Sequence, residues 1–122
     1  MSSESAEGLY DLLTHDCKFW SPIVHTPQCG RRLTMIYLSA AHKVFNTDFR
    51  YVREIISEDT AVLEFECTID SIEINGIDMI HVQGDQISEF KVMVRPLRAI
   101  EIIHKKMMVM LEELNPSYAD KE

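Results

Sequence analysis

The sequence has few cysteines and no closely spaced pair of them. Its three cysteines, Cys17, Cys29 and Cys67, are an odd number without any C-x-x-C spacing. A disulfide framework or a zinc knuckle needs paired or grouped cysteines, so neither is indicated. Free thiols are typical of a reducing compartment, and residues 1–8 lack the basic start and apolar run of a signal peptide. We therefore expect a cytoplasmic protein.

Basic residues and long apolar runs are also scarce. Twelve lysines and arginines face twenty aspartates and glutamates, which gives a net charge of -8. An acidic surface repels nucleic-acid phosphates and anionic lipid headgroups. No apolar run is long enough to span a bilayer. Neither a nucleic acid nor a membrane is therefore an expected partner.

Motifs that bind cofactors or metals are missing as well. The sequence has no G-x-S-x-G motif, phosphate-binding loop or dinucleotide fingerprint. Its five histidines show no H-E-x-x-H or other ligand spacing. We expect neither a cofactor nor a metal.

The length and composition fit a single globular domain. The chain has 122 residues, of which 46% are hydrophobic, and it contains no internal repeat, low-complexity tract or linker. We place the domain at residues 9–116, between a tail at 1–8 and a polar tail at 117–122.

Hydrophobic periodicity predicts a helix, a run of strands and a second helix. Apolar residues at helical spacing mark 31–45 and 97–114 as helices, and alternation marks the strands between them. The predicted strands are 49–57, 60–69, 72–82 and 86–95, preceded by a helical turn at 9–14, a short extended piece at 18–21 and a loop at 22–30.

The turn between the second and third of these strands has two candidates. Asn75-Gly76 is the stronger hairpin signal by itself. Asp70-Ser71 is weaker but leaves two strands of reasonable length. We favour Asp70-Ser71, with Gly76 as a bulge or a point of close approach.

The predicted element order indicates an α+β fold with an antiparallel sheet. The strand 60–69 alternates strongly, with Leu63, Phe65 and Cys67 on one face and carboxylates on the other. Because an apolar sheet face needs a cover, we expect a homodimer formed through this face.

Three stretches resemble a known family. HDCKFWSPIVHTPQCG at 15–30, INGIDMIHV at 74–82 and ISEFKVMVRPLRAIE at 87–101 resemble nuclear-transport-factor-2-like proteins of the SnoaL and ketosteroid isomerase type. The resemblance implies a cone-shaped, curved antiparallel sheet with helices over its concave face, a shortened N-terminal helix and a long C-terminal helix. The family includes isomerases, cyclases, dehydratases, hydrolases and non-catalytic binders, so the fold alone does not fix the function.

The resemblance transfers three catalytic positions unequally. Ser21 matches the general-base aspartate of ketosteroid isomerase, and a serine without a partner base cannot take up that proton. Asp78 matches the aspartic acid that stays protonated in an apolar site and donates to the oxyanion. The oxyanion tyrosine has no counterpart, although Tyr37 on the following helix is a candidate to replace it from another direction.

These positions lead to a predicted apolar pocket with a few polar groups. Asp78 is the expected acid, Glu64 or His25 the expected base, and Tyr37 the residue that orients the substrate. The expected ligand-binding residues are Phe19, Ser21, Val62, Glu66, Ile80, Phe90, Val92 and Val94.

Each candidate has a plain structural alternative. Asp78 can pair with an arginine or cap a bulge, and Glu64 and Glu66 can pair across strands with Arg53 or Arg95. His25 can be an exposed loop residue, and Tyr37 a core aromatic. His104 is read as a packing histidine.

Three hypotheses about function follow. The first is a cofactor-independent acid/base enzyme of isomerase, cyclase, dehydratase or hydrolase type that acts on an apolar ring-like compound. The second is a non-catalytic module that binds a small apolar molecule. The third is a dimerisation scaffold.

Overall fold

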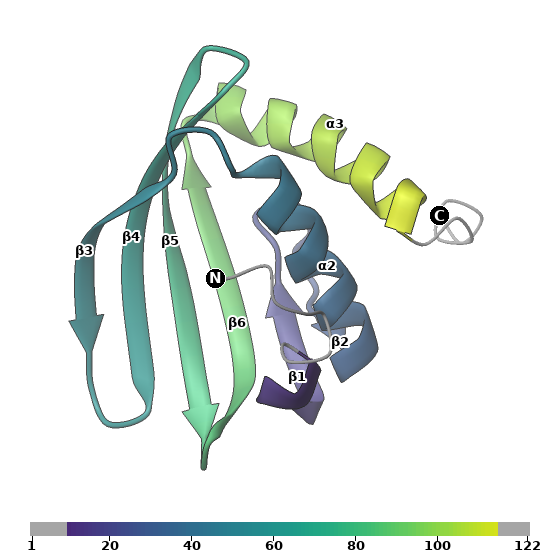
Figure 1. The fold of residues 1–122 in the computed structure, drawn as a ribbon, viewed down its shortest axis with the longest axis vertical. Helices are drawn as coiled ribbons and strands as arrows, with labels where there is room; N and C mark the ends of the chain where they lie inside the picture. Colours follow the sequence, from purple (N-terminus) through teal and green to yellow (C-terminus); the bar gives the residue numbers. More distant parts are fainter. Residues whose placement is uncertain (1–9, 115–122) are drawn as a thin grey trace.

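The computed structural model describes residues 10–114, which form one curved sheet with two long helices on its concave side (Figure 1). The predicted tails at 1–8 and 117–122 lie outside the described residues. Both long helices appear where periodicity predicts them. The elements are β1 (Leu13–Trp20), β2 (Gln28–Cys29), α2 (Arg31–Val44), β3 (Arg50–Ile56), β4 (Thr60–Ile69), β5 (Ile72–Gln83), β6 (Gln86–Arg95) and α3 (Leu97–Leu114).

The six strands have the order β2-β1-β6-β5-β4-β3. The pairs from β3 through β6 are antiparallel, as expected, and so is the β1–β2 pair. The β1–β6 pair is parallel, so the sheet is mixed and the expectation of an all-antiparallel sheet is wrong at this pair. No hairpin joins β1 to β6, so no turn fixes their relative direction.

The N-terminal elements differ from the prediction. Residues 10–12 are helical, but Leu13 and Thr14 already belong to β1, so the predicted helical turn ends too late. The strand is also longer than the predicted extended piece at 18–21. Inside the predicted loop at 22–30, Gln28 and Cys29 form β2 and pair with Phe19 and Lys18. Partners distant in sequence, not local periodicity, decide these boundaries.

The Asp70-Ser71 turn is confirmed. Both residues have positive φ, 51° and 67°, and Ile69 pairs directly with Ile72. Two successive residues of positive φ make the tight turn that matches the twist of two antiparallel strands. The turn sets an unbroken register in which Leu63 faces Asp78 and Phe65 faces Gly76.

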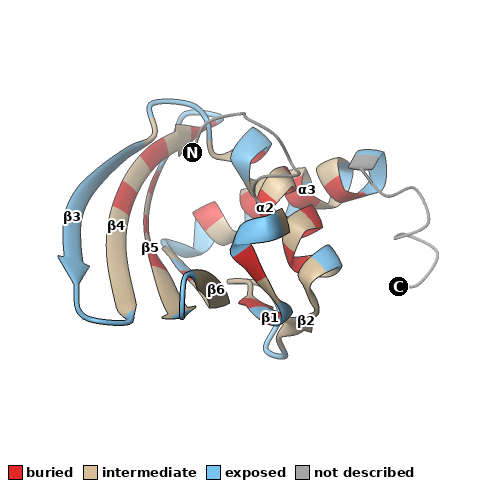
Figure 2. Cartoon of the chain, turned by 60° about the horizontal axis from the view of Figure 1, so that its bottom comes forward, coloured by how far each residue is buried: buried red, intermediate tan, exposed pale blue. Residues whose placement is uncertain are grey.

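This register corrects the prediction of which sheet face is covered. Phe65 and Cys67 are buried on the concave side, where Phe65 packs edge-on against Phe45 at the end of α2. The two helices lie on this side of the sheet (Figure 2). The face expected to meet a second subunit is therefore the protein's own core. Among the described residues, no helix is long and apolar enough to cross a bilayer.

Gly76 is a point of close approach, not a bulge. The β4–β5 register runs through it without a shift. A Cβ built at Gly76 would overlap the ring of Phe65 and lie 2.8 Å from the backbone oxygen of Met93. The absence of a side chain therefore lets the Phe65 ring lie flat against the sheet.

Gly76→Ala should destabilise the fold by about 1–3 kcal/mol, because the added methyl group overpacks the core. Urea unfolding measures the change. In a Phe65→Leu background the same substitution should cost less, since the ring atoms that the methyl group meets are gone. An equal cost in both backgrounds would contradict the close-approach interpretation.

Candidate functional site

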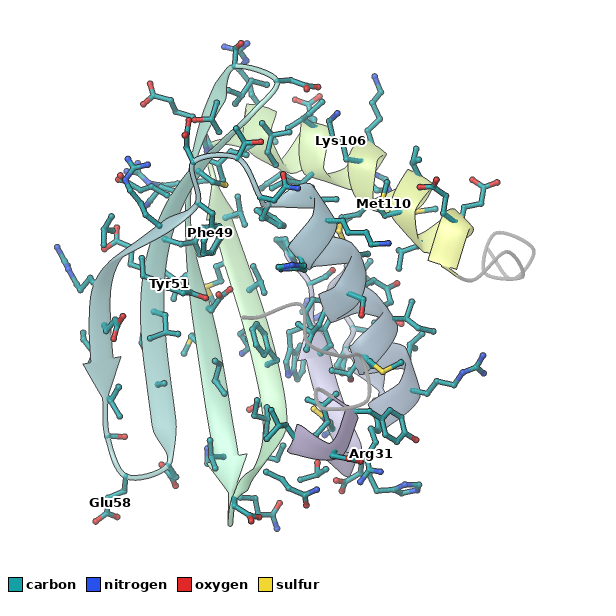
Figure 3. All side chains as sticks on the ribbon, in the orientation of Figure 1. Arg31, Phe49, Tyr51, Glu58, Lys106 and Met110 are labelled. Atoms are coloured by element: carbon teal, nitrogen blue, oxygen red, sulfur yellow. The ribbon has the colours of Figure 1, made fainter. Side chains whose placement is uncertain are left out.

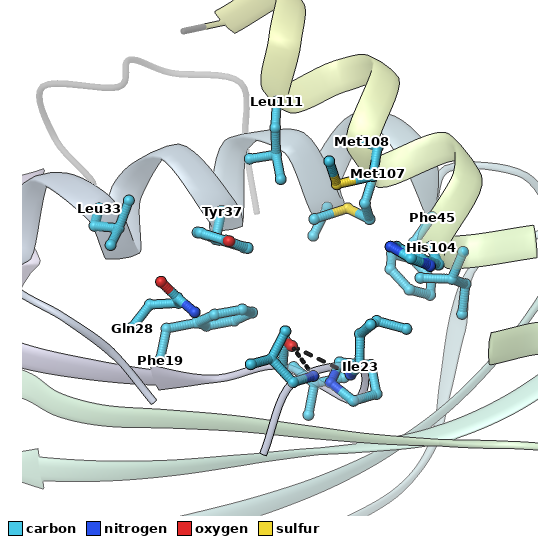
Figure 4. Close-up of a pocket in the computed structure, with 16 residues that line it drawn as sticks. Phe19, Ile23, Gln28, Leu33, Tyr37, Phe45, His104, Met107, Met108 and Leu111 are labelled. Carbon is cyan, nitrogen blue, oxygen red and sulfur yellow. Dashed lines mark hydrogen bonds between the residues drawn. The ribbon is translucent and has the colours of Figure 1, made fainter. Parts of the chain in front are cut away.

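A cavity of about 420 Å³ lies between the two helices and the loop that follows β1 (Figure 4). Its size is typical of a small-molecule site. Most of the lining is apolar, and the polar side chains are a serine, a glutamine, a tyrosine and a histidine. The lining residues are Phe19, Ser21, Pro22, Ile23, Val24, Gln28, Leu33, Tyr37, Ala41, Phe45, Val92, Ile103, His104, Met107, Met108 and Leu111.

Four of the predicted site residues line this cavity: Phe19, Ser21, Tyr37 and Val92. The rings of Phe19 and Tyr37 lie 5.3 Å apart and form part of one wall. The loop at 21–24 is held by the Ser21 Oγ, which accepts hydrogen bonds from the backbone N–H groups of Ile23 and Val24. Sequence reasoning missed the contribution of α3, since helical periodicity does not tell a core stripe from a cavity wall.

Asp78 lies beside this cavity and does not line it. Asp78 on β5 pairs directly with Val92 on β6. Val92 lines the cavity, so Asp78 is one strand away from the cavity wall. Asp78 is only 8% exposed. Burial raises the pKa of its carboxyl to about 6, and a hydrogen bond from Tyr51 partly offsets the rise. The carboxyl therefore exchanges its proton near neutral pH.

Tyr51 is the functional candidate that sequence reasoning missed. Its Oη donates to Asp78 Oδ2 over 3.2 Å, and Figure 3 shows Tyr51 and its neighbour Phe49 on the concave side. Burial, and then the charge of Asp78, raise the pKa of Tyr51 to about 12. The phenol keeps its proton and stays a donor. The alternation of side chains along β3 could have indicated Tyr51. A register shift between Tyr51 and Arg53 interrupts that alternation, so the sequence does not show which face Tyr51 occupies.

Neither alternative for Asp78 is seen in the described part of the chain. The salt bridges there do not involve Asp78, and its pairing with Leu63 lies in an unbroken register. No group of three His, Cys, Asp or Glu side chains among residues 10–114 is arranged to hold a metal ion. The chemistry at hand is that of one buried carboxyl and one phenol.

Known structures share the fold of this chain. A steroid delta-isomerase from Pseudomonas aeruginosa is 34% identical, with a TM-score of 0.84 over 90% of this chain and 82% of that chain. The chain belongs to the nuclear-transport-factor-2-like superfamily. An uncharacterised cystatin-like protein from Silicibacter pomeroyi is 26% identical, with a TM-score of 0.83 over 95% of this chain and 84% of that one.

A SnoaL-like polyketide cyclase from Jannaschia, described as putative, is 8% identical, with a TM-score of 0.66 over 81% of this chain and 78% of that chain, and so shares the fold alone. No family model matches the sequence, and no curated protein matches it. The nuclear-transport-factor-2-like assignment thus rests on structure and on the 34% identity.

Within this nuclear-transport-factor-2-like sheet, the expected carboxylate cluster does not form. Glu64 pairs with Ile77, and Glu66 with Asn75, so both point to the convex face, away from Asp78. Glu64 lies 3.5 Å from Arg53 and accepts a hydrogen bond from Asn75. Val62, two residues along, shares this face. The prediction that these three residues line the pocket is wrong, because the register puts Leu63 and Phe65, not Glu64, on the same face as Asp78.

The convex carboxylates are paired across strands: Glu64 with Arg53, as the alternative interpretation proposed, and Glu66 with Arg50 in place of the partners named there. Arg50 and Glu66 form an ion pair of 2.7 Å. Arg95 Nε donates to Asn75 Oδ1, which links it indirectly to Glu64. These pairs occupy the carboxylates and leave Asp78 as the buried acid of the described residues.

The remaining candidates fall in three places. Ile80, Phe90 and Val94 share the concave face with Asp78 but do not line the cavity. His25 is exposed and lines a separate groove beside Trp20 and Lys91. His104, read as a packing residue, is exposed and lines the cavity. His25, the expected base, therefore does not line the cavity.

The pH dependence of stability should report the Asp78 pKa. The folded pKa lies above the unfolded value of about 4, so stability falls as pH rises from about 4 to 7. At roughly 1.4 kcal/mol per pKa unit, the fall for this group is about 3 kcal/mol. It should be larger in Tyr51→Phe, because the lost hydrogen bond stabilises the ionised carboxyl, and smaller in Asp78→Asn.

Urea unfolding at several pH values measures this fall. Phe49→Leu is the control, since Phe49 packs against the Tyr51 ring without bonding to Asp78. It should change stability by a similar amount at each pH. A Tyr51→Phe profile that overlays the wild-type profile would show that the hydrogen bond does not tune Asp78.

Proposed function

We propose that the protein binds an apolar, ring-like small molecule on the concave side of its sheet and transfers protons on it without a cofactor. The observation that carries the proposal is the buried Asp78 carboxyl, with its pKa near 6 and its hydrogen bond from Tyr51. In this assignment the neutral carboxyl donates a proton to the substrate, and the carboxylate takes one back. Tyr51 holds the carboxyl in position.

The similarity to known proteins supports this reaction class. The 34% identical protein is a steroid delta-isomerase, and the SnoaL-like neighbour is a putative polyketide cyclase. Isomerisation and cyclisation of ring compounds both need protons moved between carbon and oxygen, which is the work of a tuned acid/base group. The apolar cavity next to Asp78 offers room for the rings.

Non-catalytic binding is the second candidate. One observation favours it: the cavity lining contains no carboxylate, and Asp78 lies behind Val92. A ligand confined to the cavity would not touch Asp78. The two candidates differ in whether Asp78 takes part in turnover: the enzyme needs its carboxyl, and the binding module has no turnover for it to affect.

Asp78→Asn should abolish turnover of any ring compound that stabilises the wild type in a thermal-shift screen. The amide cannot donate and recover a carboxyl proton, so we expect a loss of at least a hundredfold. Glu64→Gln is the matched control, because it makes the same change on the convex face and should leave turnover intact. Product formation is followed chromatographically at pH 6–7.

The outcome separates the two candidates. Turnover that survives Asp78→Asn would remove Asp78 from the mechanism. Ring compounds that bind both proteins equally, with no product from either, would favour the binding module. A compound at a hundred times its Kd should stabilise the fold by about 2.7 kcal/mol, which is readily seen.

We also propose that a second copy of the chain covers the convex face. Ile55 and Met93 are 59% and 51% exposed, and the register places them on this face with Val62, Ile77 and Met79. The charges there are already paired as Arg50–Glu66 and Arg53–Glu64. An apolar face with internally paired charges repels an identical face little.

Ile55→Lys should convert the dimer to a monomer, as measured by light scattering after size-exclusion chromatography. Ile56→Lys is the control, since Ile56 is the next residue of β3 but faces the concave side. It should leave the dimer intact. A wild-type protein that is monomeric at micromolar concentration would contradict the proposal.

A further inference from the structure

The hydrogen bonds around Ser21 leave its hydroxyl group free to donate to a ligand but not to accept from one. The Oγ atom accepts the backbone N–H of Ile23 over 3.2 Å and that of Val24 over 3.1 Å, and dashed lines in Figure 4 mark both bonds. A hydroxyl has one donor hydrogen and two acceptor lone pairs. Both lone pairs are therefore taken by the protein's own loop.

The hydroxyl hydrogen is what remains. The described residues provide no acceptor for it, while Ser21 lines the cavity beside Phe19 and Val92. A ligand that fills the cavity displaces any water bonded to this hydrogen. An unbonded donor in an apolar cavity weakens binding, so the ligand that suits the site carries an acceptor there.

Two of the other three polar side chains of the cavity, Gln28 and His104, do not impose this direction. Gln28 and His104 line the cavity without a hydrogen-bond partner among residues 10–114, but an amide and a neutral imidazole can each donate or accept. Neither selects for an acceptor over a donor. Ser21 alone of these three groups discriminates by polarity.

We propose that Ser21 donates a hydrogen bond to an acceptor oxygen of the ligand, so that ring ketones are favoured over ring hydrocarbons of the same shape. The inference rests on the proposed function, because it names the ligand class of the proposed binding site. With its two lone pairs taken by the loop, the Ser21 hydroxyl offers the cavity a donor.

Two variants of matched size separate the two roles of the Ser21 side chain, which are donating a hydrogen bond to the ligand and accepting hydrogen bonds from the loop. Ser21→Asn keeps an acceptor for the loop N–H groups and also supplies an N–H donor. Ser21→Asp keeps the acceptor but, once ionised, has no donor. The probes are the tricyclic ketone fluorenone and the corresponding hydrocarbon fluorene. Their Kd values are measured by thermal shift at a series of concentrations, with equal unfolding temperatures of the ligand-free variants as the folding control.

We expect wild type and Ser21→Asn to bind fluorenone about five- to tenfold more tightly than fluorene, as one hydrogen bond predicts. In Ser21→Asp the two Kd values should be equal, or reversed. Equal Kd values in the wild type, or a preference that survives Ser21→Asp, would overturn the donor role and leave the proposed binding function standing. Failure of both probes to bind the wild type would overturn both.

Discussion

The register of the β4–β5 hairpin is the constraint on which the rest of the structure depends. Two residues of positive φ at Asp70-Ser71 close the hairpin, and because side chains alternate along a strand, a slip of one residue would exchange the two faces. The observed register places Phe65 and Asp78 on the concave face and Glu64 on the convex face. This one turn therefore assigns Phe65 to the core, Asp78 to the concave face and Glu64 to the outer surface.

The concave face then accommodates a carboxyl among aromatic and aliphatic side chains. Phe65 stacks on Phe49, whose ring meets Tyr51 edge-on, and Gly76 leaves room for the Phe65 ring beside Asp78. In this apolar environment the carboxyl loses hydration, which destabilises its ionised form and raises its pKa. The hydrogen bond from Tyr51 stabilises the ionised form and offsets part of this rise. Packing against the helices and tuning of the acid are thus consequences of one arrangement of side chains.

The cavity depends on a second set of contacts, at the other edge of the sheet. The parallel β1–β6 pair brings Phe19 next to Phe90, and Ser21 folds the following loop back under α2 and α3. Cavity and acid are neighbours that share Val92 as a boundary. A ligand large enough to extend past Val92 would join them, which is the geometry that the proposed proton transfer needs.

The sequence by itself determined the α+β class, the family, both long helices and the Asp70-Ser71 turn, and it singled out Asp78 as a candidate acid, because periodicity, turn chemistry and motif resemblance are local properties. Only the tertiary structure decided that β1 runs parallel to β6, that Glu64 and Glu66 lie on the convex face, and that Tyr51 bonds to Asp78. Those outcomes depend on register and on contacts between residues as far apart in sequence as Leu13 and Ile87, 74 positions from one another. Alternation along one strand reveals that two faces exist, but only pairing with its neighbours reveals which face is inside.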